Sequence, residues 1–197
     1  LTGLQNLGNT CYMNSCLQNL IHCPPFISYF LEISNQIFQN NTNYPISTAF
    51  YELLLYLSES STEDSISPQD FFKKFISTHD PFYGNQEHAT QEFCRFFLQD
   101  LNYELNRKTK ITSYEKENFN ELKRGKFINF KNDCLSKENS IITDIFIGYF
   151  SFEYQCDCGF KEYMFSQFLD LPIQFDKNNK QFDLCEMLKE NFYKVSY

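Results

Sequence analysis

The chain has 197 residues, of which 42% are hydrophobic and 18% aromatic, and its formal net charge is −8. This aromatic content can fill a core, which excludes a disordered segment, and the acidic balance disfavours a nucleic-acid partner, because phosphate binding needs clustered Lys and Arg. No apolar run approaches the ~20 residues that span a bilayer, and residues 1–10 lack the layout of a secretion signal, so no membrane partner is expected. Eight irregularly spaced cysteines do not make a dense disulfide framework, so we expect free thiols and a cytoplasmic or nuclear location.

Helical periodicity dominates the first half of the chain. The first apolar stripe is ended by Pro24 and Pro25. Ser67 is the expected N-cap of a further helix that has Pro68 at its first position. Six phenylalanines are expected to form the core between helices, rather than an exposed groove for a partner: Phe71, Phe72, Phe75, Phe93, Phe96 and Phe97. The remaining helices are predicted over residues 10–22, 46–57 and 89–106.

The second half is patterned differently. Residues 108–126 are charged and weakly periodic, which indicates a connection. From Ser140 the period becomes two, and this predicts a half-buried strand around residues 150–156, a turn at CDCGF and a second strand over 161–171. A short helix is expected near residues 183–193. Helices followed by a hairpin predict an α+β fold, which we divide into residues 1–110, a connection over 111–138, and residues 139–197.

One cysteine occupies a distinctive position in NLGNTCYMNSCLQNL, which begins at Asn6. Asn9 or Thr10 can cap the first helix, which places Cys11 in its first turn. Unpaired N–H groups and a partial positive charge at a helix N-terminus favour a thiolate, and a thiolate is the nucleophilic form of cysteine. A cysteine at a helix start is also commonly just a packing residue, so both interpretations of Cys11 stay open at this point.

Two neighbours of Cys11 sharpen the first interpretation. Gly8 allows a tight turn before the helix. The carboxamide of Asn6 can then fold back and donate an N–H to an oxyanion that forms at a carbonyl attacked by Cys11. Cys16, in contrast, lies on the apolar stripe, and we interpret it as a small hydrophobic residue.

Three segments resemble one known family. GLQNLGNTCYMNSCLQNL (residues 3–20) closely resembles the cysteine box of the ubiquitin-specific proteases, the papain-like deubiquitinases. EHATQEFCRFFLQDL (87–101) resembles the family's glutamine-aspartate box, and NSIITDIFIGYFSFEYQCDCGFKEYMFSQFLDLPI (139–173) resembles the stretch that enters its fingers. The resemblance implies a papain-like cysteine protease fold. Its helical thumb would cover residues 1–110, and the antiparallel strands of the fingers and palm would begin within 139–197.

The resemblance also implies roles for individual residues. Cys11 corresponds to the nucleophile and Asn6 to the oxyanion-hole donor, with the backbone N–H of Cys11 as a second donor. Gln91 and Glu92 match positions that contact the basic, extended C-terminal tail of ubiquitin. The implied reaction is cleavage after the C-terminal glycine of ubiquitin through a thioester on Cys11, with ubiquitin or ubiquitinated proteins as partners and no cofactor.

The chain departs from the family pattern at the second box and at the histidine. The aspartate usual in the second box is replaced by Ala89, and Glu87, His88 and Asp100 are the candidates to substitute for it. The family's catalytic histidine comes from a downstream box that the chain's three histidines do not match. His22, for example, lies about 16 Å along the helix axis from Cys11, at 1.5 Å per residue.

We therefore expect the chain to be the N-terminal part of a catalytic domain, with the C-terminal half missing and no useful activity alone. His79 and His88 are expected to be solvated. Two further functions stay open: a non-catalytic ubiquitin-binding scaffold that keeps the cysteine box, and a protease for a ubiquitin-like modifier. No metal is expected, because Cys156 and Cys158 are a single pair and structural zinc needs four ligands.

Overall fold

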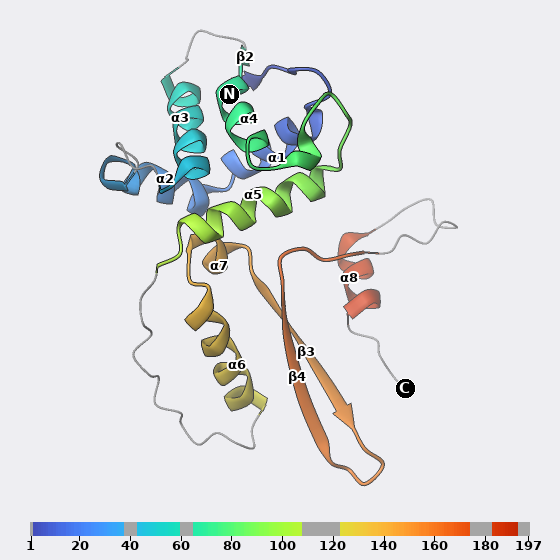
Figure 1. The fold of residues 1–197 in the computed structure, drawn as a ribbon. Helices are drawn as coiled ribbons and strands as arrows, with labels where there is room; N and C mark the ends of the chain where they lie inside the picture. Colours follow the sequence, from blue (N-terminus) through green and yellow to red (C-terminus); the bar gives the residue numbers. More distant parts are fainter. Residues whose placement is uncertain (1, 38–42, 60–64, 108–122, 174–182, 193–197) are drawn as a thin grey trace.

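A computed structural model describes residues 2–37, 43–59, 65–107, 123–173 and 183–192 of the chain. Figure 1 shows the first helices gathered at one end and a long hairpin that projects away from them. In chain order the elements are β1 (Gly3–Leu4), α1 (Cys11–Ile21), α2 (Pro24–Ile37), α3 (Pro45–Glu59), β2 (Ser65–Ile66), α4 (Gln69–Ile76), a 3-10 helix (Asp80–Phe82), α5 (Thr90–Glu104), α6 (Lys123–Lys137), α7 (Ile141–Ile145), β3 (Gly148–Gln155), β4 (Lys161–Phe168) and α8 (Leu184–Phe192).

An aromatic core joins helices α1 to α5. The ring of Phe50 in α3 lies 5.0 Å from that of Phe30 in α2 and 5.2 Å from that of Phe97 in α5. Phe75 of α4 meets Phe93 of α5 at 4.8 Å, so α3 and α4 both pack on α5. Burying a side chain of this size contributes about 1.5–3 kcal/mol. The predicted phenylalanine core is confirmed: Phe71, Phe75, Phe93 and Phe97 are buried, and Phe72 and Phe96 are partly buried against them. Four further phenylalanines are completely buried in the same core: Phe26, Phe30, Phe50 and Phe82.

Two details of the helix predictions are wrong. The prolines Pro24 and Pro25 do end α1, but they also open α2, which the sequence pattern did not reveal. Proline fits there because the first turn of a helix needs no backbone N–H donors. Ser67 does not cap α4; Pro68 is the N-cap residue, and no side chain bonds to the free N–H groups of the first turn.

The end of α5 caps the start of α3. The carboxylate of Glu104 accepts hydrogen bonds from the backbone N–H groups of Ile46 at 2.9 Å and Ser47 at 2.7 Å. These N–H groups have no partner within their own helix, and a negative charge at this position is favoured by the helix dipole. One side chain therefore fixes two helices that lie far apart in the sequence.

The end of α4 is joined to α5 by a buried pair. His79 is 9% exposed, stacks on Phe75 at 4.4 Å between ring centres, and lies 3.4 Å through Nε2 from Oδ2 of Asp100. Burial raises the pKa of Asp100 to about 6, against the opposing effect of His79. The expectation that His79 is solvated is therefore wrong, because the rings of Phe75 and Phe82, which are close in the chain, and of Phe96 in α5 pack around it.

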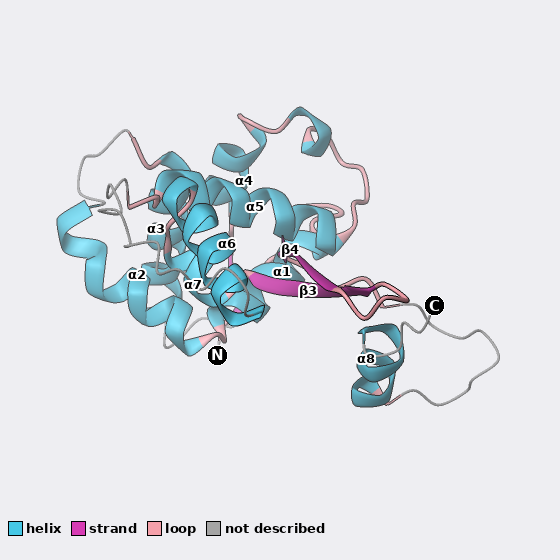
Figure 2. Ribbon diagram, turned by 90° about the horizontal axis from the view of Figure 1, so that it is seen from below, coloured by secondary structure: helices cyan, strands magenta, loops and turns pink. Residues whose placement is uncertain are grey.

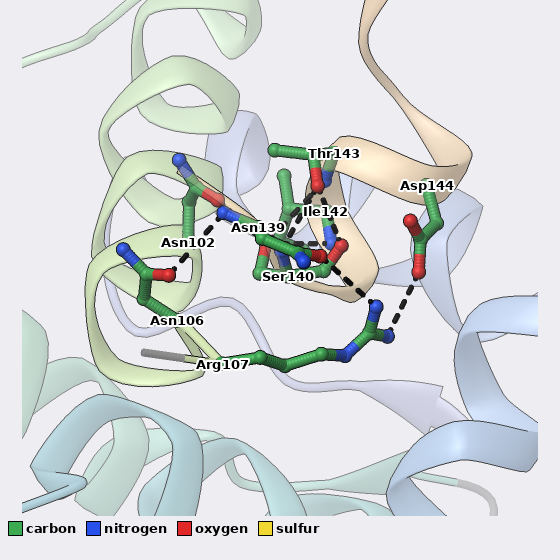
Figure 3. Close-up of polar contacts among 8 residues, drawn as sticks. All are labelled: Asn102, Asn106, Arg107, Asn139, Ser140, Ile142, Thr143 and Asp144. Carbon is green, nitrogen blue, oxygen red and sulfur yellow. Dashed lines mark hydrogen bonds and ion pairs between the residues drawn. The ribbon is translucent and has the colours of Figure 1, made fainter. Parts of the chain in front are cut away.

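A group of polar contacts, which we call the clamp, joins the residues that follow α5 to those at the start of α7 (Figure 3). The backbone N–H of Arg107 donates to the carbonyl of Asn139 at 2.7 Å, and the N–H of Asn139 donates to Oδ1 of Asn106 at 3.2 Å. The guanidinium of Arg107 also lies 2.8 Å from Asp144. Ser140 caps α7 and donates to Oδ1 of Asn102 in α5 at 2.5 Å. Residues 107 and 139 are thus held together.

The region expected to be a connection contains a helix. Residues 123–137 form α6, so the expected connection over 111–138 is corrected for that part, while residues 111–122 lie outside the described chain. Phe127 and Phe130 of α6 pack against Phe165 of β4 at 5.4 and 5.8 Å between ring centres. Figures 1 and 2 both show α6 lying between α7 and the hairpin tip, beside the hairpin. Two aromatic anchors in a charged helix give too weak a period to be recognised from sequence.

The predicted hairpin is confirmed. Strands β3 and β4 pair antiparallel in a register that sets Gly148 opposite Phe168 and Gln155 opposite Lys161. A Cβ atom on Gly148 would lie 2.2 Å from the ring of Phe168, so any other residue there would require this ring to move. The strands are less buried than expected towards the tip, where Phe152 is 45% and Met164 57% exposed. The short helix predicted near residues 183–193 is α8, and Phe192 of α8 stacks on Phe150 at 5.3 Å.

Candidate active site

A short strand pair fixes the segment that leads into α1. Strand β1 pairs in parallel with β2, and the backbone N–H of Gln5 donates to the carbonyl of Ile66 at 2.8 Å. From the other side, the side chain of Asn14, one turn inside α1, donates to the carbonyls of Leu4 and Gln5 at 3.3 and 3.0 Å. The backbone that leads into residue 6 is therefore anchored by β2 and by α1.

The carboxamide of Asn6 is held in one orientation. Its Oδ1 accepts hydrogen bonds from the N–H of Gly8 at 3.0 Å, the N–H of Thr10 at 3.1 Å and the hydroxyl of Thr10 at 3.2 Å. Thr10 is the N-cap residue of α1, is 2% exposed, and accepts in turn from the N–H of Leu7 at 2.9 Å. Three donors on one atom identify that atom as the oxygen. The Nδ2 of Asn6 makes no hydrogen bond within the described chain, so Asn6 presents a free donor.

The turn between Asn6 and α1 uses left-handed backbone. Gly8 has φ +102° and Asn9 has φ +53°, a region that suits glycine and, among other residues, asparagine. The side chain of Asn9 donates to the carbonyl of Asn85 at 2.8 Å, which ties the turn to the loop before α5. The chain therefore reverses tightly and enters α1 at Cys11.

The two cysteines of α1 lie in opposite environments. Cys11 is the first residue of α1 and its side chain is exposed, beside the unpaired N–H groups of the first turn. Cys16 is 4% exposed, and pairing with the thiol of Cys94 together with burial raises the pKa of Cys16. The interpretation of Cys16 as a packing residue is confirmed, and Cys11 is the accessible thiol of the helix.

Gln91 and Glu92 lie in the first turn of α5, and both are exposed. Nε2 of Gln91 donates to Oδ2 of Asp170, which follows β4, and Nε of Arg95 lies 3.6 Å from the other oxygen of Asp170. Arg95 and Asp170 also line an open pocket of about 780 Å³ between α5, α7 and β4. Glu92 lies 3.9 Å from Nδ1 of His88. The start of α5 thus meets the end of the hairpin.

The four residues selected from the sequence lie around one helix junction. The hydroxyls of Ser15 in α1 and Thr90 in α5 are 3.2 Å apart. Cys11 lies one helical turn before Ser15, and Gln91 directly follows Thr90. Asn6 with Cys11, and Gln91 with Glu92, therefore occupy neighbouring helix ends.

None of the chain's three histidines, all within the described ranges, forms a hydrogen bond with Cys11. His22 caps the far end of α1, where its Nδ1 lies 2.5 Å from the carbonyl of Gln18. His88 packs among aromatic rings, 4.7 Å from that of Phe82, and only 12% of its side chain is exposed. The expectation that His88 is solvated is wrong, as it was for His79.

The three residues proposed to replace the aspartate missing at Ala89 differ in whether a substrate could reach them. Asp100 faces the buried His79, and His88 packs inside, so neither lies on the exposed surface of α5. Glu87 is exposed in the loop before α5. The carboxylate in direct contact with Gln91 is that of Asp170.

Cys156 and Cys158 lie exposed at the hairpin tip. The backbone N–H of Cys156 donates to the carbonyl of Phe160 at 2.8 Å, and Gly159 closes the turn with φ +85°. Two thiols supply half of the four ligands that structural zinc needs. Across the described ranges no group of three or more His, Cys, Asp and Glu side chains is arranged to hold a metal ion.

Comparison with known proteins gives the family. The model of the family described as ubiquitin carboxyl-terminal hydrolase matches residues 2–189. The chain belongs to this family. The human ubiquitin carboxyl-terminal hydrolase 2 is 34% identical over 185 residues, which cover 90% of this chain and 30% of that protein. The putative ubiquitin carboxyl-terminal hydrolase 11 of Arabidopsis thaliana is also 34% identical over 185 residues, with 88% and 20% covered.

Solved structures agree with the α+β papain-like fold expected for a ubiquitin carboxyl-terminal hydrolase. The SAGA Ubp8/Sgf11/Sus1/Sgf73 DUB module bound to ubiquitin aldehyde matches with a TM-score of 0.67 and 22% identity, over 96% of this chain and 38% of that chain. The same module bound to monoubiquitin matches with a TM-score of 0.69 and 21% identity, over the same shares. The chain thus spans 20–30% of the length of the two ubiquitin carboxyl-terminal hydrolases and 38% of the matched Ubp8 module chains. Within the described ranges no helix is both long and apolar enough to cross a membrane.

Two features of the site were missed by sequence reasoning. Asp170 lies 79 positions from Gln91, and only the fold brings the two side chains together. Thr10 was considered as a helix cap, but its hydroxyl turns back to Asn6 and makes no cap bond. The strand predicted over residues 161–171 included Asp170, whereas β4 ends at Phe168, so the sequence pattern gave no signal for this residue.

Proposed function

We propose that this chain forms the nucleophile-bearing part of a cysteine-type deubiquitinase whose partners are ubiquitin or ubiquitinated proteins. The observation that carries the proposal is the pairing of an exposed cysteine at a helix N-terminus with an asparagine whose oxygen is held by three donors and whose N–H₂ is free. Membership of the ubiquitin carboxyl-terminal hydrolase family supports the choice of substrate. The eight free thiols support a cytoplasmic or nuclear location.

The proposed reaction begins with attack of the Cys11 thiolate on the carbonyl carbon of the C-terminal glycine of ubiquitin. The electron pair of the carbonyl moves to its oxygen, which receives hydrogen bonds from Nδ2 of Asn6 and the backbone N–H of Cys11. Collapse of this intermediate expels the amine, which takes up a proton, and leaves a thioester on Cys11. Water then attacks the thioester, releasing the ubiquitin carboxylate and the thiol.

Gln91 and Glu92 are proposed to hold the tail that leads to this glycine. Both are exposed at the start of α5, next to the α1 junction. A basic, extended tail suits a carboxylate at Glu92, since charge-assisted hydrogen bonds are the stronger kind.

The proton transfers need a base that the contacts of this chain do not supply. The side-chain partners of the three histidines lie elsewhere: Nδ1 of His22 is next to the carbonyl of Gln18, His79 is next to Asp100, and His88 is next to Glu92. We propose that a histidine outside residues 1–197 serves this role, and that the chain alone hydrolyses its substrate at a negligible rate. The same placement favours the second candidate function, a non-catalytic ubiquitin-binding scaffold.

A ubiquitin probe with a C-terminal electrophile separates the two functions. In the intact protein, labelling that disappears in the Cys11→Ala variant supports the enzyme. The matched control is Cys185→Ala, an exposed cysteine of α8, which should leave labelling unchanged. Binding of ubiquitin without labelling supports the scaffold, and labelling only by a probe built on a ubiquitin-like modifier would assign a different substrate.

A further inference from the structure

The carboxylate of Asp170 bridges two side chains of α5. One oxygen accepts from Nε2 of Gln91 and the other lies 3.6 Å from Nε of Arg95. Gln91 and Arg95 are four positions apart, so they lie on one face of the helix. Asp170 comes two residues after the end of β4 and therefore joins the start of α5 to the base of the hairpin.

This contact decides which end of the Gln91 side chain is presented to a ligand. A glutamine carboxamide has a donor end and an acceptor end. The donor end is committed to a carboxylate, and such charge-assisted bonds are stronger than neutral ones. The reversed amide would set its oxygen against the carboxylate, which is unfavourable. Oε1 of Gln91 accepts no hydrogen bond within the described chain, so the exposed end of the side chain is an acceptor.

We infer that Asp170 is a positioning residue that orients Gln91 as a hydrogen-bond acceptor for the incoming substrate tail. The inference rests on the proposed function, because it specifies how the same site takes its substrate. An acceptor at this place selects a partner that donates: the backbone N–H groups of an extended chain, or basic side chains on it. The open pocket of about 780 Å³ that Asp170 and Arg95 line adjoins this position.

A purely structural role for Asp170 would look different. The side chains of Asp170 and Arg95 are 37% and 53% exposed, and ion pairs that exposed contribute little to stability. The chain offers a matched control in Asp144, which is 44% exposed and lies 2.8 Å from Arg107 at the other end of α5. Removing either carboxylate should change the thermal midpoint of unfolding by a similar, small amount.

The test is a double-mutant cycle in the intact protein, with steady-state cleavage of a fluorogenic ubiquitin C-terminal amide. Asp170→Ala is expected to raise KM about three- to tenfold, the range for one hydrogen bond, with kcat changing by less than about twofold. If Asp170 acts through Gln91, the double variant with Gln91→Ala has the KM of Gln91→Ala alone. Asp144→Ala should leave KM unchanged.

A conservative variant separates the hydrogen bond from the ion pair. Asp170→Asn keeps an acceptor for Gln91 and loses the charge beside Arg95. Its KM should therefore lie close to that of the unsubstituted protein. A KM as high as that of Asp170→Ala assigns the effect to Arg95 and overturns the inference. The inference is also overturned if the rise in KM of the double variant equals the product of the rises in the two single variants. An unsubstituted intact protein that cleaves no ubiquitin conjugate overturns the proposed function, and the inference falls with it.

Discussion

Asn6 allows the structural and the catalytic contribution of one side chain to be separated by two substitutions. Asn6→Ala removes the oxygen that accepts from Gly8 and twice from Thr10, and it leaves the buried Thr10 hydroxyl without that acceptor. At about 0.5–1.5 kcal/mol each, and with the Gly8 bond exposed, the three bonds sum to a loss of about 1–3 kcal/mol in the free energy of unfolding. Asn6→Asp keeps an acceptor in the same place, next to a helix N-terminus that favours negative charge, so its unfolding free energy should change by less than about 0.5 kcal/mol.

Catalysis should respond in the opposite pattern. In the proposed mechanism both substitutions remove the Nδ2 group that would donate to the oxyanion, and loss of one such donor lowers kcat by about 10²–10³-fold. The aspartate also places a negative charge where the oxyanion forms, so Asn6→Asp should be at least as slow as Asn6→Ala although it is the more stable protein. Chemical denaturation gives the stability, and kcat with a fluorogenic ubiquitin amide gives the rate. An Asn6→Asp protein with the turnover of the unsubstituted enzyme would refute this reasoning.

Three further predictions concern the fold. Glu104→Ala should lower the free energy of unfolding by about 1–2 kcal/mol, because the α3 N-terminus loses its cap, whereas the exposed control Glu52→Ala should lie within about 0.5 kcal/mol of the original in the same denaturation assay. Asp100 has a pKa raised by burial from 3.8 to about 6, so the folded protein binds more protons than the unfolded chain between these values. Its contribution to stability is present below pH 4 and is lost as the pH rises through 6. In Asp100→Asn the denaturation midpoint should not decrease between pH 4 and pH 6 in this way. If the midpoint decreases equally with pH in both proteins, the decrease does not come from Asp100. Gly148→Ala should destabilise the hairpin by about 1–3 kcal/mol, because the new methyl group would strike the ring of Phe168; unchanged amide hydrogen exchange in β3 and β4 would argue against that register.

The sequence predicted those parts of the fold that depend on residues close together in the chain. The apolar stripe of α1, the core phenylalanines and the alternating strands of the hairpin each have a period that the sequence displays directly. The turn before Cys11 was predictable for the same reason, since Gly8 and Asn9 lie where the left-handed backbone occurs. The fold class and the family follow from such local signals.

What the sequence could not predict depends on contacts between distant segments. The burial of His79 is completed by the ring of Phe96 in α5, at 5.2 Å between ring centres. Helix α6 is stabilised by packing of Phe127 and Phe130 on a hairpin that begins later in the chain. The bridge from Asp170 to α5 spans 79 positions. No periodicity within a window of ten or twenty residues carries this information.

The clamp between Arg107 and Asn139 has a consequence for how the protein tolerates change in length. A stretch whose two ends already touch can gain or lose residues at little cost, since loop-closure free energy rises by only about 0.6 kcal/mol for each doubling of length. Residues inserted between 108 and 122 would therefore leave α5, α7 and the cysteine helix where they are. A fluorescent protein or an affinity tag inserted there should therefore leave the arrangement of these helices unchanged.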